Sequence, residues 1–321
     1  MNSKAITAGR LATRLRQSDW RESMIYIGFF ALFLFFAVTL RDSGFLTTTN
    51  LLNVFRQTAT ISVMAVAMTF VIASAEIDLS VGAVAGLASV VAAMAIRDYG
   101  PVPGVLAGLA SGVLIGAING GFVARLGVPS FLVTLGMLGV VEGFSRLISG
   151  SYPIAITSDP FVAVFGGGDL GPIPGLLIWA LLFAAAGAAV MNRTTFGRRV
   201  LATGGNQTAA KYTGINTARV KFTVLVLSSA AAAVAGMLYA GRLHSGRFQW
   251  GEGDELSVIA AVILGGTGLF GGRGTVIGSL FGALLIGLTN NGLVLAGLDV
   301  SQQQIVRGLI ILAAVALSRK R

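Results

Sequence analysis

The sequence predicts an all-α integral membrane protein with about ten transmembrane helices. Its 321 residues are 55% hydrophobic and only 11% charged, whereas a soluble domain carries about a quarter charged residues. The mean hydropathy is +0.82, and apolar windows close to the length of a membrane span recur along the whole chain. We therefore expect residues 1–321 to form a single transmembrane domain rather than a globular domain with one anchor.

Each predicted span is a run of apolar residues between polar or glycine-rich breaks. The windows lie at about 24–40, 57–75, 79–96, 102–124, 129–149, 172–191, 222–240, 256–270, 275–296 and 304–317. Several are shorter than the ~20 residues that a straight span needs, which is typical of broken helices buried inside transporters. The first window is not a cleavable signal sequence, because Arg41 and Asp42 follow it instead of small residues.

The positive charges predict that both chain termini are cytoplasmic. Residues 1–23 carry Lys4, Arg10, Arg14, Arg16 and Arg21, and loops on the cytoplasmic side are enriched in Lys and Arg. With ten spans, most of the 23 basic residues fall on this side. The basic residues assigned to the outer side are Arg41, Arg56, Arg97, Arg146, Arg242, Arg247 and Arg307. This asymmetry explains the net charge of +10 without a nucleic-acid partner.

The two halves of the chain contain related segments. LIGAINGGFV at 114–123 matches LIGLTNNGLV at 285–294, and Asp78-Leu-Ser-Val matches Glu255-Leu-Ser-Val. The matched spans are separated by an odd number of crossings, so they traverse the membrane in opposite directions. The sequence thus predicts an inverted repeat that relates spans 2–5 to spans 7–10, as in many transporters.

Carboxylates fall near the ends of the predicted spans. Asp78 and Glu255 are equivalent in the repeat, one toward the cytoplasm and one toward the outside, and each precedes a predicted helix. Two interpretations stay open: the carboxylates cap the helices, assisted by Ser80 and Ser257, or they line a translocation path. Glu76 has no counterpart in the repeat and is expected to be solvated at the inner surface.

Glu142 and Arg146 lie four residues apart in the fifth predicted span. That spacing and order suit an ion pair on one face of a helix. We expect this pair to be structural and to lie near the outer interface.

The loop at 192–221 is the longest basic loop and is expected in the cytoplasm. Within it, Asn206 is placed to cap a short helix over 207–213, and Gly214 supplies a left-handed end. An exposed helix of this length is marginal on its own. We therefore expect it to dock into a groove of a partner protein.

Four motifs in order resemble the permease subunits of ribose-type sugar ABC importers. They are EIDLSVG at 76–82, GGNQTAAKYTGI at 204–215, ELSVIAAVILGGTGLFGGRG at 255–274 and NNGL at 290–293. The resemblance runs from Phe45 to Leu317. One departure is Glu76, where that family usually has glycine, so backbone flexibility is not transferred to this position.

This resemblance implies a multi-pass subunit of the bacterial inner membrane with the ABC importer permease fold. It implies a second permease chain, most simply a homodimer, and a periplasmic or extracellular sugar-binding protein at the outer face. It also implies a separate ATPase subunit with two nucleotide-binding sites beneath the membrane. The substrate would be a monosaccharide, such as a pentose, a hexose or a polyol, and lipid would surround the chain.

The resemblance and the repeat together select candidate functional residues. Those expected at the translocation path or gate are Asp78, Ser80, Asn119, Glu255, Asn290, Asn291, Gly265 and Gly266. Those expected to couple to the ATPase are Gly204, Gly205, Asn206, Ala209, Ala210, Gly214 and Ile215. Asparagine side chains both donate and accept, as sugar hydroxyls require, although they equally suit hydrogen bonds between helices.

The sequence offers no catalytic constellation, so we expect a transport subunit rather than an enzyme, with no cofactor and no metal on this chain. There is no cysteine and a single histidine, His244. The segment GGTGLFGGRG lacks the Gly-Lys-Ser/Thr of a phosphate-binding loop and is expected to form a tight turn between spans. Two alternatives stay open: a stand-alone secondary transporter, and an ABC permease for a non-sugar solute such as an amino acid.

Overall fold

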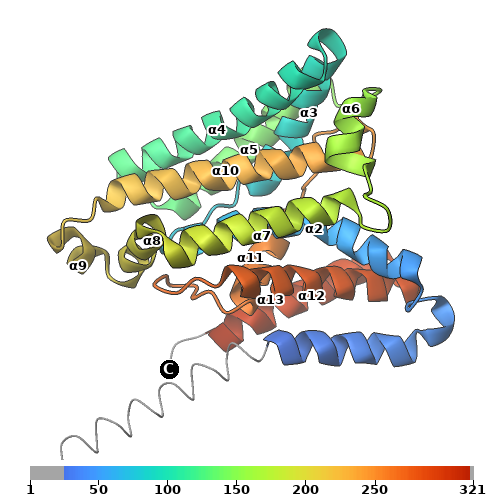
Figure 1. Ribbon diagram of the computed structural model, residues 1–321. Coiled ribbons are helices and arrows are strands. Elements are labelled where there is room, and N and C mark those ends of the chain that lie inside the picture. Colours follow the sequence, from blue (N-terminus) through green and yellow to red (C-terminus); the bar gives the residue numbers. More distant parts are fainter. Residues whose placement is uncertain (1–24, 319–321) are drawn as a thin grey trace, which may run out of the picture.

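The computed structural model describes residues 25–318, and nearly all of them are helical (Figure 1). Seven helices are long and apolar enough to cross a membrane within this range. They are α2 (Thr48–Ala73), α3 (Val81–Tyr99), α4 (Pro101–Arg125), α5 (Ser130–Ser149), α7 (Gly175–Arg193), α10 (Thr217–Arg242) and α12 (Val276–Leu295). The segment 1–23 lies outside the described residues.

The remaining predicted spans correspond to shorter or less apolar helices. These are the first helix, Ile25–Thr39, then α11 (Asp254–Leu264) and α13 (Val300–Ser318). The helix expected over 256–270 is shorter than its window, because α11 has 11 residues and ends at the Gly265–Gly266 turn, as predicted for a broken helix. A helix of that length rises only ~16 Å, about half the thickness of the hydrocarbon core.

The short elements lie at the two ends of the bundle (Figure 1). One end carries α8 (Thr195–Gly205) and α9 (Gln207–Tyr212), and the opposite end carries α6 (Asp159–Val162), which runs into the π-helical turn Ala163–Gly167. A 3₁₀ turn, Arg41–Ser43, follows the first helix. Two short antiparallel strands, β1 (Ile154–Ala155) and β2 (Ser245–Gly246), join the segments that follow α5 and α10.

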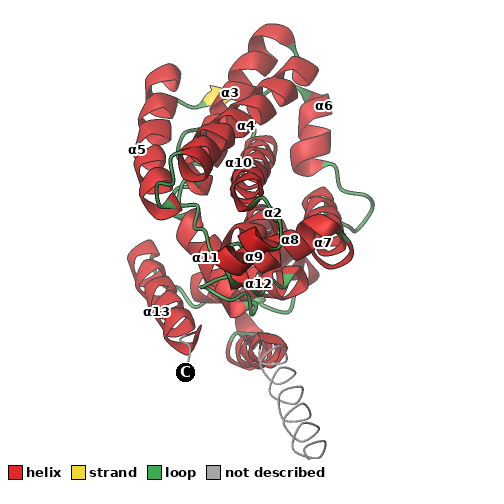
Figure 2. Cartoon of the chain, turned by 90° about the vertical axis from the view of Figure 1, so that its left-hand side faces the viewer, coloured by secondary structure: helices red, strands yellow, loops and turns green. Residues whose placement is uncertain are grey.

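Helices α2 and α10 form the centre of the bundle (Figure 2). Every residue of α2 from Thr58 to Ala73 is buried. Helix α10 packs against α2, α3 and α4, while α2 packs against α10, α11 and α12. The two central helices therefore hold the two halves of the chain together.

A glycine stripe positions α4 against α3 and α10. Five buried glycines recur every fourth residue along α4, at Gly104, Gly108, Gly112, Gly116 and Gly120. A Cβ on Gly112 would lie 2.6 Å from the carbonyl oxygen of Ser229 in α10, so only glycine admits this approach. The other faces of α4 expose large apolar side chains such as Leu106 and Phe122, as expected beside lipid.

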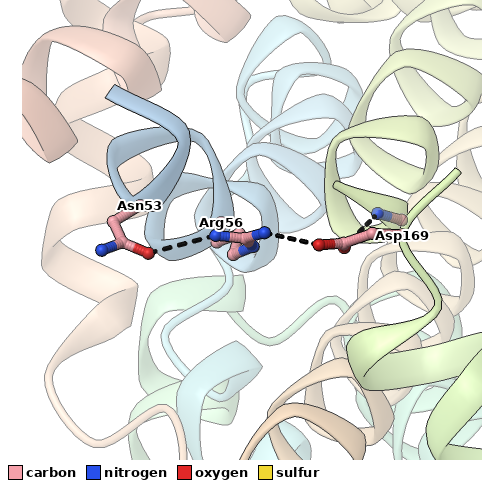
Figure 3. Close-up of polar contacts among 4 residues, drawn as sticks. Asn53, Arg56 and Asp169 are labelled. Carbon is pink, nitrogen blue, oxygen red and sulfur yellow. Dashed lines mark hydrogen bonds and ion pairs between the residues drawn. The ribbon is translucent and has the colours of Figure 1, made fainter. Parts of the chain in front are cut away.

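An ion pair ties α2 to the loop that precedes α7 (Figure 3). Arg56 of α2 contacts Asp169 through Nη2 and Oδ2 at 2.5 Å. The same guanidinium donates through Nη1 to Asn53 Oδ1 at 3.3 Å. Asp169 also accepts from the backbone N–H of Gly175, the first residue of α7, at 3.2 Å. These contacts fix where α7 begins relative to α2.

Candidate functional site

The chain is extended between the end of α2 and the start of α3. Helix α2 ends in a Schellman turn, in which the N–H of Ala75 donates to the carbonyl of Ile72 and the N–H of Glu76 donates to Val71. Ala75 adopts a left-handed φ of 65°, a position that usually carries glycine. This turn fixes the backbone of Glu76 and leads into the extended segment that carries Asp78.

Asp78 organises the start of α3. Its side chain is buried, and Oδ1 accepts from both the N–H and the hydroxyl of Ser80, at 2.9 and 2.7 Å. Asn119 of α4 donates to the Ser80 hydroxyl at 3.0 Å. Three of the predicted path residues are therefore in one hydrogen-bonded group, and Asp78 uses one carboxylate oxygen to hold the residue that precedes α3.

Hydroxyl groups of α5 satisfy the extended backbone, and the sequence analysis missed them. Ser130 Oγ accepts from the N–H of Ile77, and Thr134 Oγ1 accepts from the N–H of Leu79, each at 3.0 Å. Backbone polar groups inside a membrane domain need such partners. The available signal was the four-residue spacing of Ser130 and Thr134, which places both on one face of a predicted span.

The segment that follows α10 runs back along α3. Ser89 exchanges hydrogen bonds with the backbone of Arg247, and a Cβ on Gly82 would lie 2.2 Å from the carbonyl oxygen of Gly251. The same Cβ would lie 2.4 Å from Glu255 Oε2. The starts of α3 and α11 thus meet after approaching from opposite ends of α10, because Glu76 contacts Lys221 near the start of α10 and Asp254 contacts Tyr239 near its end. This arrangement agrees with the prediction that Asp78 and Glu255 lie toward opposite surfaces.

The capping interpretation fails for Glu255. Helix α11 begins one residue earlier, at Asp254, and no side chain caps it; its N-cap residue is Gly253, with φ 78°. Ser257 is buried and does not cap the helix. Asp254 instead accepts a hydrogen bond from the Tyr239 hydroxyl of α10 at 2.6 Å, a link that the sequence analysis did not foresee.

The asparagines of the repeat do not share a site. Asn291 of α12 forms a reciprocal amide pair with Asn50 of α2, with contacts of 3.0 and 2.8 Å. Asn119 contacts Ser80 instead, and Asn290 is half-buried. For Asn291 the geometry favours the alternative of a hydrogen bond between helices.

The short helix predicted after Asn206 is confirmed as α9, while its docking onto a partner stays a prediction. Asn206 Oδ1 accepts from the N–H of Ala209 at 2.9 Å, and Gly214 has a left-handed φ of 84°. Ala209 is exposed, whereas Ala210 is buried within the chain itself, so only the first can face a partner. The sequence analysis missed Tyr212, whose side chain is 89% exposed on this helix.

Helix α8 was not predicted, and Gly204 and Gly205 belong to it rather than to a loop. A Cβ on Gly204 would lie 2.0 Å from the carbonyl oxygen of Ala73 and 2.9 Å from the N–H nitrogen of Gly272. Gly272 itself donates to that carbonyl at 3.0 Å. The end of α2, the end of α8 and the turn that follows α11 therefore meet in direct backbone contact.

The glycine-rich segment after α11 forms the tight turn predicted from the sequence. Gly266 adopts a left-handed φ of 93°, and Gly265 packs against Gly278 of α12, where a Cβ would lie 2.4 Å from the carbonyl carbon. The turn connects α11 to α12 without extending away from the bundle.

Charged side chains pair as follows in the described part of the chain. Glu142 and Arg146 form the ion pair predicted within α5. The prediction that Glu76 is solvated was wrong: its carboxylate is buried and contacts Lys221 Nζ of α10 at 2.6 Å. Within residues 25–318, no group of His, Cys, Asp and Glu side chains is arranged to hold a metal ion.

Three features are typical of a membrane transport subunit. The bundle has helices long enough to cross a membrane, the starts of α3 and α11 meet inside it, and the short helix α9 is exposed at one end. The chain matches the family described as branched-chain amino acid transport system / permease component over residues 50–315, and it belongs to that family. It is thus a permease component of an ABC transporter, a multi-pass membrane protein and not an enzyme. Members of this class work with an ATPase and a binding protein.

Curated relatives cover most of the chain. It is 41% identical to the probable ABC transporter permease protein YphD of Escherichia coli, over 88% of this chain and 85% of the relative. It is 39% identical to the ribose import permease protein RbsC of Bacillus subtilis, over 92% of each chain. It is 37% identical to the fructose import permease protein FrcC of Rhizobium meliloti, over 83% of this chain and 76% of the relative. No solved structure matches significantly.

Proposed function

We propose that this chain forms the translocation path of a bacterial ATP-driven importer of monosaccharides. The observation that carries the proposal is the meeting of the starts of α3 and α11 at Gly82 and Glu255. Interrupted helices of this kind place polar groups and free helix ends inside a membrane domain, where a solute can be bound. The relatives named for ribose and fructose import support a monosaccharide as the solute.

The proposed architecture has ten spans and an inverted repeat, with both termini in the cytoplasm. Matched packing supports the repeat: α4 packs against α10 and α3, while α12 packs against α2 and α11. Likewise α5 packs against α3, and α13 packs against α11. The end that carries α8 and α9 would face the cytoplasm, and the end that carries α6 would face outward (Figure 1).

The proposed partners follow from these surfaces. A separate ATPase subunit with two nucleotide-binding sites would grip α9, and a sugar-binding protein would deliver solute near α6. A second permease chain would lie against α5 and α13, which both expose large apolar side chains. Those side chains include Phe131, Leu135, Phe144 and Leu147 of α5, and Ile305, Leu309 and Leu312 of α13. The partners would bias inward- and outward-facing states.

Reconstitution tests the proposal. Proteoliposomes that contain this chain with its cognate ATPase and binding protein should accumulate radiolabelled D-ribose, L-arabinose or D-fructose only when ATP is present on the ATPase side. Uptake that follows an ion gradient without ATP would identify a secondary transporter. Uptake of L-leucine in place of the sugars would identify an amino-acid permease and contradict the substrate class.

A further inference from the structure

We propose that Glu76 is a positioning residue that links the docking helix α9 to the interrupted helix α3, through Lys221 and Gln207. The inference rests on the proposed function, because it takes α9 as the helix that the ATPase grips. It assigns a role to a residue where the ribose-type permeases that this chain resembles usually carry glycine.

A continuous set of polar contacts joins the three elements. Glu76 Oε1 lies 2.6 Å from Lys221 Nζ, and the side chains are 7% and 18% exposed. The same Nζ donates to Oε1 of Gln207 at 3.1 Å. Gln207 is the first residue of α9, and Lys221 lies near the start of α10. These two contacts connect the segment after α2 to the start of α10, and the start of α10 to α9.

The contacts span a region in which the elements do not pack closely. A cavity of about 520 Å³ lies here, lined by Glu76 and Ile77, by Pro129 and Ser130 at the start of α5, and by residues of α9 and α10. A displacement of α9 is therefore carried across the cavity by the charged pair. Because the two side chains are only 7% and 18% exposed, water screens their attraction less than that of a pair on the surface.

The segment 74–80 between α2 and α3 can transmit such a displacement to the start of α3. The Schellman turn holds the backbone of Glu76, and Asp78, two residues further on, holds Ser80 immediately before α3. Few torsions separate the charged pair from the helix start. A shift of Lys221 with α9 should therefore change the position of the first turn of α3.

Cysteine labelling can follow the break directly, because the chain has no cysteine. In the reconstituted complex with the ATPase, we would label Leu79→Cys with a polar maleimide, without nucleotide and with ATP and vanadate. Glu76→Gln should weaken the nucleotide-dependent change in labelling rate by about 2- to 30-fold, the range for residues that couple two sites. Thr208→Cys on α9 should keep its protection by the ATPase. Asp98→Asn, which breaks the exposed Arg97–Asp98 pair, should leave the change at residue 79 intact.

Two further variants separate coupling from folding. Gln207→Ala breaks the link on the side of α9 and leaves the ion pair intact, so it should also weaken the change. The exchange Glu76→Lys with Lys221→Glu should restore it, because the Gln207 amide can donate to a carboxylate as well as accept from an ammonium. A merely structural pair would lower the amount of folded complex but leave the nucleotide dependence of the folded fraction unchanged.

The outcomes are distinct. Full nucleotide dependence in Glu76→Gln overturns the inference, and so does a Leu79→Cys parent that binds the ATPase but shows no nucleotide-dependent change. In both cases the proposed function stands if uptake requires ATP. Failure of the parent permease to bind the ATPase overturns the proposed function, and the inference with it.

Discussion

Replacing Gly204 with alanine should disturb the contact between helix α8 and the rest of the bundle. The new Cβ would lie 2.0 Å from the carbonyl oxygen of Ala73 and 2.9 Å from the backbone nitrogen of Gly272. Both neighbours are backbone atoms of other elements, so no side-chain rotation can relieve the overlap. Helix α8 would have to move away from the end of α2 and from the turn after α11.

The expected magnitude combines two opposing effects. Overpacking of this kind costs about 1–3 kcal/mol, while alanine in place of glycine within a helix gains about 0.5–1 kcal/mol. The net result should be a destabilisation of up to about 2.5 kcal/mol, with weaker ATPase docking. Gly205→Ala is the matched control, because its Cβ would lie at an ordinary 3.7 Å from Gly272. That variant should be neutral or slightly stabilising.

Thermal unfolding in detergent, followed through the three tryptophans, compares the two variants. Gly204→Ala should melt at a lower temperature than the wild type and retain less ATPase on co-purification, while Gly205→Ala should do neither. If both variants melt alike and retain the ATPase equally, then α8 is not held by this contact and the reasoning fails.

Three further predictions concern the docking helix, the topology and the break. Ala209→Glu should weaken ATPase docking by at least about tenfold, because burying an unpaired polar group costs ~1–3 kcal/mol and a charge costs more; unchanged co-purification would remove α9 from the interface. Thr208→Cys should resist an impermeant reagent added outside intact cells and Ser158→Cys should react, and the reverse labelling would refute the assigned orientation. Asp78→Asn should preserve ATP-driven uptake to within about tenfold, because an amide oxygen still accepts from Ser80, whereas Asp78→Leu should abolish uptake by leaving buried donors unpaired. Equal loss in both would show that the charge itself is needed.

Caps and apolar runs in the sequence predicted the positions of individual helices. The asparagine cap and the left-handed glycine were enough to place α9, and the long apolar runs placed the seven long helices. Helix α8 was missed because Gly204 and Gly205 are poor helix formers, and it is the packing of Gly204 against Ala73 that holds them in a helix. The helix expected over 256–270 extends less far than its apolar window, because the window includes the turn that begins at Gly265.

The contacts of the candidate site could not be predicted from the sequence, because they join segments that are far apart in the chain. The repeat and the resemblance drew attention to Asp78, Ser80 and Asn119, but they could not show that the three residues share one hydrogen-bonded group. The pairing of Glu76 with Lys221 was invisible because it joins the break after α2 to the start of α10. The meeting of Gly82 with Glu255 depends on the segment after α10 turning back along α3, which carries no hydropathy signal.

The glycine stripe of α4 limits which motions an alternating-access cycle can use. Because α4 approaches the backbone of α10 at Gly112, Gly116 and Gly120, separating or sliding the two helices would disrupt all of these contacts at once. The two helices should therefore move as one rigid body. Flexing is then left to segments such as the glycine-rich turn 265–274, so an element that interrupts the helices also acts as a hinge between moving blocks.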